Sequence, residues 1–138
     1  MFFSGRNAPV PDALVVVSAT VQEPALGFLR EAAAEDPGLV RLDIRPGEDI
    51  TARTRAVLAH GGFSRVLAVG GDGTASAVAA VAAEAGIPLG IVPGGTGNVI
   101  AKDLGVPVNP ADAIRAALDP KAVKRPVDAF RANGRFCL

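Results

Sequence analysis

The 138-residue sequence has one cysteine, one histidine, no tryptophan and no tyrosine, and its only aromatic residues are six phenylalanines. A single thiol, Cys137, excludes an internal disulfide framework and is consistent with a reducing compartment. The formal net charge is zero, and few aromatic side chains are available to stack on bases. We therefore expect no nucleic-acid partner.

Long hydrophobic runs are also missing, although 49% of the residues are apolar. Runs such as Ala13–Val17 and Val66–Val69 are far below the roughly 20 residues that a membrane-spanning helix needs. The first six residues include two Phe but no extended apolar stretch, so a secretory signal is not expected. We expect one compact cytoplasmic domain over residues 1–138, with peripheral association to a membrane as an open alternative.

Short apolar runs alternate with segments of helical periodicity along most of the chain. Strands are expected at 14–17, 39–44, 65–69 and 88–92, and helices at 23–35, 49–60, 75–85, 99–104 and 111–118. This alternation predicts an α/β fold of three layers, a doubly wound and mainly parallel sheet with helices on both faces. Such sheets place ligands at the carboxyl ends of their strands.

The end of the chain has a different pattern, which predicts the start of a β-hairpin. Residues 123–131 and 135–138 are expected to be strands, joined at Asn133-Gly134 by a type I′ turn. The domain core is then about 13–122, and an exposed last strand is expected to fray or to pair with a second copy, as in a homodimer. From residue 121 onward there are five basic residues and one acid. We favour a solvated basic hairpin, and the alternative is a surface for an acidic neighbour or an anionic membrane.

Three glycines in four positions follow the third expected strand, in Gly70-Gly71-Asp72-Gly73-Thr74. Glycine permits close approach of a ligand to the backbone, and the following helix offers free N–H groups that suit a phosphate. Asp72 is unexpected at an anion site unless it holds Mg²⁺ or accepts a hydrogen bond from a hydroxyl. The structural alternative is that Asp72 only caps a helix.

Two common nucleotide-binding fingerprints are absent. The sequence contains no G-x-x-x-x-G-K-[ST] segment, which excludes a P-loop NTPase. It also has no G-x-G-x-x-G after its first strand, which disfavours a Rossmann hydride-transfer enzyme.

The 70–74 segment resembles the signature of a kinase superfamily that includes NAD kinases, diacylglycerol kinases and sphingosine kinases. A second loop distinguishes among them, because residues 90–98 resemble the strand and P-x-G-T-x-N loop of the diacylglycerol kinase branch. Residues 101–107 and 127–136 continue this resemblance. An NAD kinase, which shares only the first loop, is the alternative.

The resemblance implies the family's N-terminal α/β domain, in which both loops hold ATP. It places Gly70, Gly71, Gly73 and Thr74 near the phosphates and assigns Asp72 to Mg²⁺ or to the acceptor hydroxyl. In the second loop it places Gly94, Gly95 and Gly97 beside the nucleotide, and Thr96 and Asn98 would offer polar contacts to the nucleotide or the acceptor. It also implies a lipid kinase that phosphorylates a hydroxyl such as that of diacylglycerol at a membrane surface.

Several positions depart from the family's pattern. Ser18-Ala19-Thr20 stands where the family has an Asn-Pro pair and a Gly, although Ser18 could still contact nucleotide, as could Arg45 at the end of the second strand. Ser76-Ala77 replaces an Asn-Glu pair, and Val99 replaces an acid. The family's β-rich C-terminal domain, with its catalytic carboxylates, is expected beyond residue 138, so the chain alone is expected to be inactive. The alternative is a non-catalytic nucleotide-binding or assembly module.

Overall fold

The computed structural model describes residues 12–138, so the expectation about a secretory signal in the first six residues lies outside the described part. The elements in chain order are β1 (Ala13–Val17), α1 (Ala25–Glu35), β2 (Leu39–Asp43), α2 (Ile50–Leu58), β3 (Arg65–Gly70), α3 (Asp72–Ala85), β4 (Leu89–Pro93), α4 (Val99–Asp103), α5 (Pro110–Leu118), β5 (Phe130–Ala132) and β6 (Arg135–Cys137).

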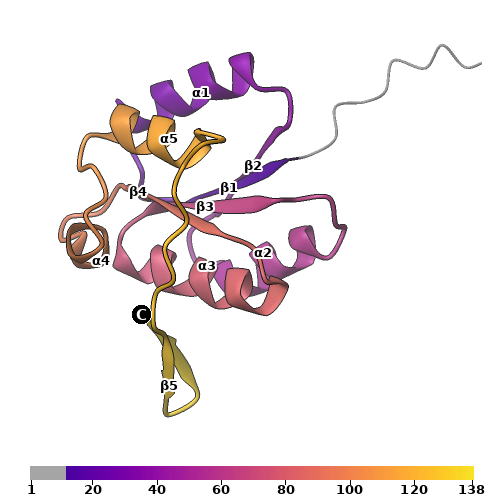
Figure 1. Ribbon diagram of the computed structural model, residues 1–138, viewed down its shortest axis with the longest axis vertical. Coiled ribbons are helices and arrows are strands. Elements are labelled where there is room, and N and C mark those ends of the chain that lie inside the picture. The colour runs from indigo at the N-terminus through magenta and orange to yellow at the C-terminus, as the bar shows by residue number, and fades with distance from the viewer. Residues whose placement is uncertain (1–11) are drawn as a thin grey trace, which may run out of the picture.

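The first four strands form a parallel sheet in the order β2-β1-β3-β4. Helices α1 and α5 cover one face of this sheet, and α2 and α3 cover the other (Figure 1). The predicted three-layer α/β fold is therefore confirmed. Because all four strands are parallel, their carboxyl ends meet at one edge, where the loops after β3 and β4 lie.

The central strand β1 is buried on both faces, and its five residues are at most 2% exposed. Val15 packs in the same cluster as Leu29 of α1 and Ile114 of α5, whereas Val16 packs with Val78 of α3. Side chains alternate between the two faces of a strand, and both faces of this sheet are covered by helices. This explains why β1 is a continuous apolar run.

Helix ends follow the capping signals in the sequence. The Asp49 carboxylate accepts a hydrogen bond from Ala52 N and begins α2, and the Asn109 side chain caps α5. Gly86 ends α3 in the left-handed conformation with φ 69°. Among residues 12–138, no helix has the length and apolar character needed to cross a bilayer.

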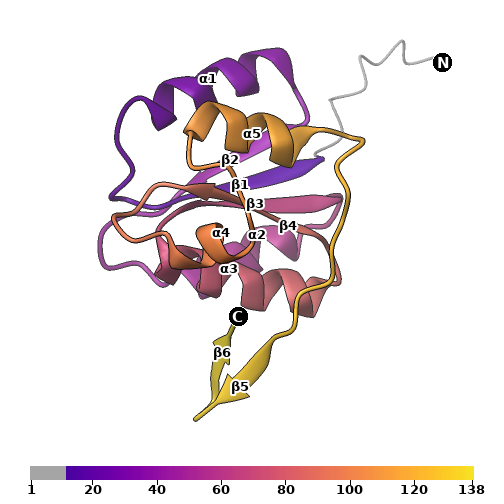
Figure 2. The ribbon, with the colours of Figure 1, turned by 60° about the vertical axis from the view of Figure 1, so that its left-hand side comes forward.

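The predicted strand over 123–131 is wrong except at its end, because β5 begins only at Phe130. Pro126 lies within the predicted strand and lacks the N–H that a strand ladder requires. The turn between the strands has the predicted type I′ character, with positive φ at Asn133 (50°) and Gly134 (75°). The hairpin projects away from the main sheet on the side of α3 (Figure 2).

Candidate functional site

The two glycine-rich loops meet at the carboxyl edge of the sheet, because β3 and β4 are neighbouring strands. The strand pairing continues into the loops, where Gly94 N donates a hydrogen bond to Gly70 O at 2.8 Å. A Cβ atom on Gly95 would lie 2.6 Å from the Cα atom of Gly71, and one on Gly94 would lie 3.2 Å from the Cα atom of Gly70. These four glycines let the backbones of the two loops pack directly against each other.

The other two glycines of the loops, Gly73 and Gly97, have space beside them for a further group. No atom lies within 4 Å of a Cβ built on Gly73, and the nearest atom to one on Gly97 is Asp72 Oδ2 at 3.6 Å. The sequence predicts that all six glycines lie near a ligand, whereas four of them pack the two loops against each other in the structure. Gly73 and Gly97 are the two glycines with room for a ligand beside them.

Asp72 joins the first loop to the helix that follows the second. Its Oδ1 accepts a hydrogen bond from Ile100 N at 2.9 Å, and its Oδ2 accepts one from Val99 N at 3.1 Å. These are first-turn N–H groups of α4, which have no acceptor within their own helix. Asp72 therefore does cap a helix, but the helix is α4, which begins 27 residues later in the chain.

The side chain of Asn98 forms hydrogen bonds within the second loop. Its side-chain oxygen accepts from Gly95 N at 3.0 Å and its amide nitrogen donates to Gly95 O at 2.9 Å. Asn98 has a positive φ of 50°, a conformation that Asn tolerates better than most residues. Its amide thus closes the turn, and the exposed Thr96 is the polar side chain of this loop that faces solvent.

The N-terminus of α3 offers unpaired donors between the loops. Within residues 12–138, the N–H groups of Asp72, Gly73 and Thr74 have no hydrogen-bond acceptor, and no side chain caps the helix. The Thr74 side chain is nearly buried over Gly70. Free N–H groups and the positive end of the helix dipole together suit an anion such as phosphate.

Ser18 and Arg45 follow β1 and β2 at the same edge of the sheet. Ser18 N donates to Val69 O at 2.9 Å, and Ser18 Oγ lies 3.1 Å from Thr20 Oγ1. Ser18 is therefore next to the first loop. Arg45 is exposed and is separated from β3 by β1, which at about 4.8 Å per strand puts it roughly 10 Å away.

The loops supply little to hold a metal. Asp72 is the one carboxylate within them, and no group of three or more His, Cys, Asp or Glu side chains gathers anywhere in residues 12–138. Magnesium often binds through one or two carboxylates together with phosphate oxygens and water. Asp72 fits that mode of binding only when a phosphate is present.

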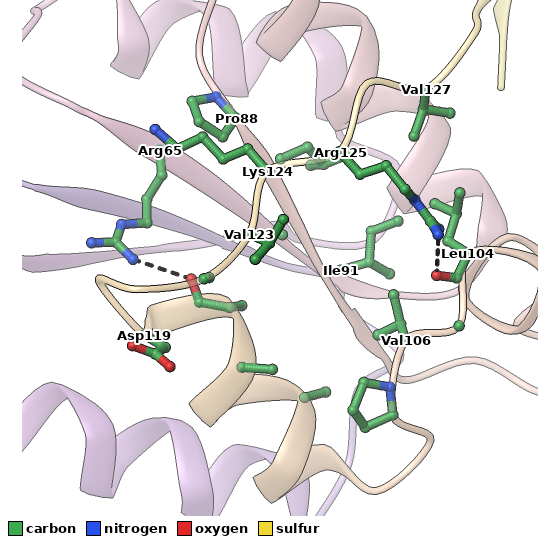
Figure 3. A pocket seen from close by; sticks show the side chains of 18 of the residues that line it. Arg65, Pro88, Ile91, Leu104, Val106, Asp119, Val123, Lys124, Arg125 and Val127 are labelled. Atoms are coloured by element: carbon green, nitrogen blue, oxygen red, sulfur yellow. Dashed lines mark hydrogen bonds between the residues drawn. The ribbon is translucent and has the colours of Figure 1, made fainter.

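A cavity of about 990 Å³ lies elsewhere, along the outer side of β4. Its walls include Ile91, Val106 and the extended segment through Val123 (Figure 3). None of residues 70–74 or 93–98 lines it. The two glycine-rich loops therefore lie outside this cavity.

Comparison with known proteins relates this geometry to one family. The family model of the diacylglycerol kinase catalytic domain matches residues 20–132. Two curated proteins named "Probable lipid kinase YegS-like" are similar: one from Xanthomonas oryzae pv. oryzae, 39% identical over 125 residues, and one from Chromohalobacter salexigens, 32% identical over 123 residues. These alignments cover 82% and 86% of this chain but 38% and 35% of the relatives.

A solved structure gives the same result. The crystal structure of a diacylglycerol kinase from Bacillus anthracis str. Sterne matches with a TM-score of 0.74 at 30% sequence identity. The match covers 91% of this chain and 45% of that one. The chain thus spans less than half the length of these three relatives.

Proposed function

This chain belongs to the diacylglycerol kinase catalytic-domain family, and we propose that it is the ATP-binding domain of a lipid kinase that transfers the γ-phosphate of ATP to a lipid hydroxyl, such as that of diacylglycerol. The observation that carries this proposal is the N-terminus of α3, whose free N–H groups lie between two interlocked loops. Phosphoryl transfer depends mainly on positioning and on neutralising charge, and these groups supply both.

The phosphates of ATP would lie over Gly73, where the backbone N–H groups are accessible and no side chain intervenes. The Thr96 hydroxyl would donate from the second loop, and Ser18 would contact the nucleotide from the end of β1. The hydrogen bonds that the Asp72 carboxylate accepts from Val99 N and Ile100 N would hold both loops in place as the nucleotide binds. Each Asp72 oxygen keeps a second lone pair, so the carboxylate could also face a water or a hydroxyl.

Mg²⁺ would be held by Asp72 with the phosphate oxygens, and it would neutralise their charge. Asp72 is already hydrogen-bonded, and it is the one carboxylate that the two loops contribute. We therefore expect the chain alone to bind ATP without phosphorylating a lipid. The remaining catalytic carboxylates would come from a β-rich second domain.

Isothermal titration calorimetry of the 138-residue chain with ATP, with and without Mg²⁺, tests nucleotide binding. Saturable binding of ATP is expected. Asp72→Asn should raise the Kd for ATP at least about tenfold, which corresponds to a loss of about 1.4 kcal/mol in binding free energy. Asp112→Asn is the matched control, because Asp112 lies in the first turn of α5 and bonds Arg115. A folded wild-type chain without ATP binding would contradict the proposal for the isolated domain.

The lipid acceptor needs a separate assay, with the longest form of the protein that its gene encodes. Transfer of labelled phosphate from ATP to diacylglycerol in vesicles is expected. ATP binding without transfer to any lipid would favour the alternative, a non-catalytic nucleotide-binding module. Tight binding of NAD without a preference for ATP would favour an NAD kinase, although the matched family is that of the diacylglycerol kinases.

A further inference from the structure

The turn after β1, over residues 18–21, contacts both glycine-rich loops. A Cβ atom built on Gly70 would lie 2.9 Å from Ser18 Cβ, and one built on Gly94 would lie 3.2 Å from Val21 Cγ2. Ser18 O accepts a hydrogen bond from Val21 N at 3.2 Å, which closes the turn. One short turn therefore meets the first loop through Ser18 and the second loop through Val21.

Val21 is the one buried residue between positions 18 and 24, and it is 6% exposed. It belongs to the same core cluster as Val69 and Val92, two strand residues that shortly precede the glycine-rich loops. Because its side chain is covered by the protein, Val21 is not available to contact a nucleotide. Any effect of Val21 on nucleotide binding must therefore act through the loops.

Gly94 packs against both Val21 and the backbone of Gly70. Gly94 N donates a hydrogen bond to Gly70 O at 2.8 Å, and a Cβ atom on Gly94 would lie 3.2 Å from Gly70 Cα as well as 3.2 Å from Val21 Cγ2. Protein interiors are closely packed, and the space left by a deleted side chain is partly filled by movement of the groups around it. Removal of the Val21 methyl groups would therefore free the second loop to move relative to the first.

We propose that Val21 is a positioning residue of the nucleotide site, which supports the second glycine-rich loop at Gly94 and so fixes the separation of the two loops. The free N–H groups at the start of α3 and the Thr96 hydroxyl belong to different loops. A nucleotide that uses both needs them at a fixed separation, because misplaced groups lose much of their effect. This inference rests on the proposed binding of ATP, and it adds a residue that neither loop contains.

Calorimetric titration with ATP and amide hydrogen exchange measured by NMR test the proposal. Val21→Ala should raise the Kd for ATP about tenfold, because a shift of the second loop misplaces the Thr96 hydroxyl. The Gly94 amide should also exchange about tenfold faster, because its hydrogen bond to Gly70 O opens more often. Val21→Thr should lower Tm yet keep the Kd within about twofold of wild type, because threonine fills the same space but buries a hydroxyl.

Val66→Ala is the matched control. Val66 is fully buried near the amino end of β3, whereas Gly70 ends this strand at the first glycine-rich loop. The same truncation at Val66 should lower Tm at least as much as Val21→Ala does, and it should leave the Kd within about twofold of wild type. If Val21→Ala does not fold, Val21→Ile takes its place, because the added methylene group would press on Gly94 and should raise the Kd about fivefold.

Wild-type affinity or wild-type exchange at Gly94 in Val21→Ala would overturn the proposal. A Kd that rises as much in Val21→Thr or in Val66→Ala as in Val21→Ala would also overturn it, because affinity would then follow overall stability alone. A folded wild-type chain that does not bind ATP would contradict the proposed function. Faster exchange at Gly94 in Val21→Ala would still show, in that case, that Val21 holds the second loop.

Discussion

Replacing Gly95 with alanine tests whether the two glycine-rich loops are interlocked. The new Cβ would lie 2.6 Å from the Cα atom of Gly71 and 3.2 Å from its nitrogen. Carbon atoms in contact are normally about 3.5–4.0 Å apart, so the loops must separate by about 1 Å. Overpacking of this kind costs about 1–3 kcal/mol.

For a domain of this size, each kcal/mol corresponds to about 4 °C in Tm, so Gly95→Ala should unfold about 4–12 °C below the wild type. Its ATP affinity should fall as well, because separation of the loops moves the Asp72 carboxylate away from the α4 N–H groups. Thermal unfolding by circular dichroism and calorimetric titration with ATP measure the two effects.

Gly73→Ala is the matched control, because no atom lies within 4 Å of the added Cβ and the position is helical. Alanine in a compatible helical position stabilises by about 0.5–1 kcal/mol, so Tm should stay level or rise. The same methyl group would stand over the free N–H groups of α3, so ATP binding should weaken about tenfold, or about 1.4 kcal/mol.

The two variants therefore separate folding from binding. Gly95→Ala with wild-type Tm and wild-type affinity would refute the interlocking of the loops. Gly73→Ala with undiminished affinity would refute the placement of phosphate at the N-terminus of α3.

Two further predictions concern stability. The Thr54 hydroxyl is fully buried and has no hydrogen-bond partner within residues 12–138. Thr54→Val should therefore leave the free energy of unfolding unchanged, or raise it by up to about 1 kcal/mol, in urea denaturation. A decrease of more than about 1 kcal/mol would contradict this expectation. Hydrogen bonds from Arg55 to Glu84, both 3.0 Å long, hold the pKa of Glu84 below its ordinary value of 4.5. A depressed folded-state pKa stabilises above the unfolded-state pKa, and this stabilisation is lost as pH falls through the folded-state pKa. Urea midpoints of wild type should therefore fall more steeply in acid than those of Glu84→Gln, and parallel profiles would show that the pair contributes nothing.

Local patterns in the sequence were sufficient to predict much of the fold. The apolar runs at β1 and β3 predicted strands, and their alternation with helices predicted a parallel sheet covered on both faces, as the structure has it. Asn133-Gly134 predicted the hairpin turn because both residues accept positive φ. Each of these signals acts within a few residues, which is why the sequence alone reveals them.

The interactions that shape the candidate site act over longer distances and could not be predicted in this way. The carboxylate of Asp72 bonds N–H groups 27 and 28 residues away, and Gly71 meets Gly95 only because β3 and β4 are adjacent. Strand order and register are needed to find such contacts. The strand predicted over 123–131 is wrong for a local reason, because Pro126 has no backbone N–H to donate to a strand ladder.

The departures from the family's pattern affect the site unequally. Val99 replaces an acid and is 57% exposed, yet its contribution to the link between the loops is its backbone N–H, which any residue except proline supplies. Ser76 and Ala77 are half-buried on α3, beyond the first-turn N–H groups that would meet phosphate. These substitutions therefore change side chains near the two loops and leave the hydrogen bonds between the loops intact. The glycine pairs and the hydrogen bonds of Asp72 involve none of these three side chains, so we expect the proposed phosphate site to tolerate the substitutions.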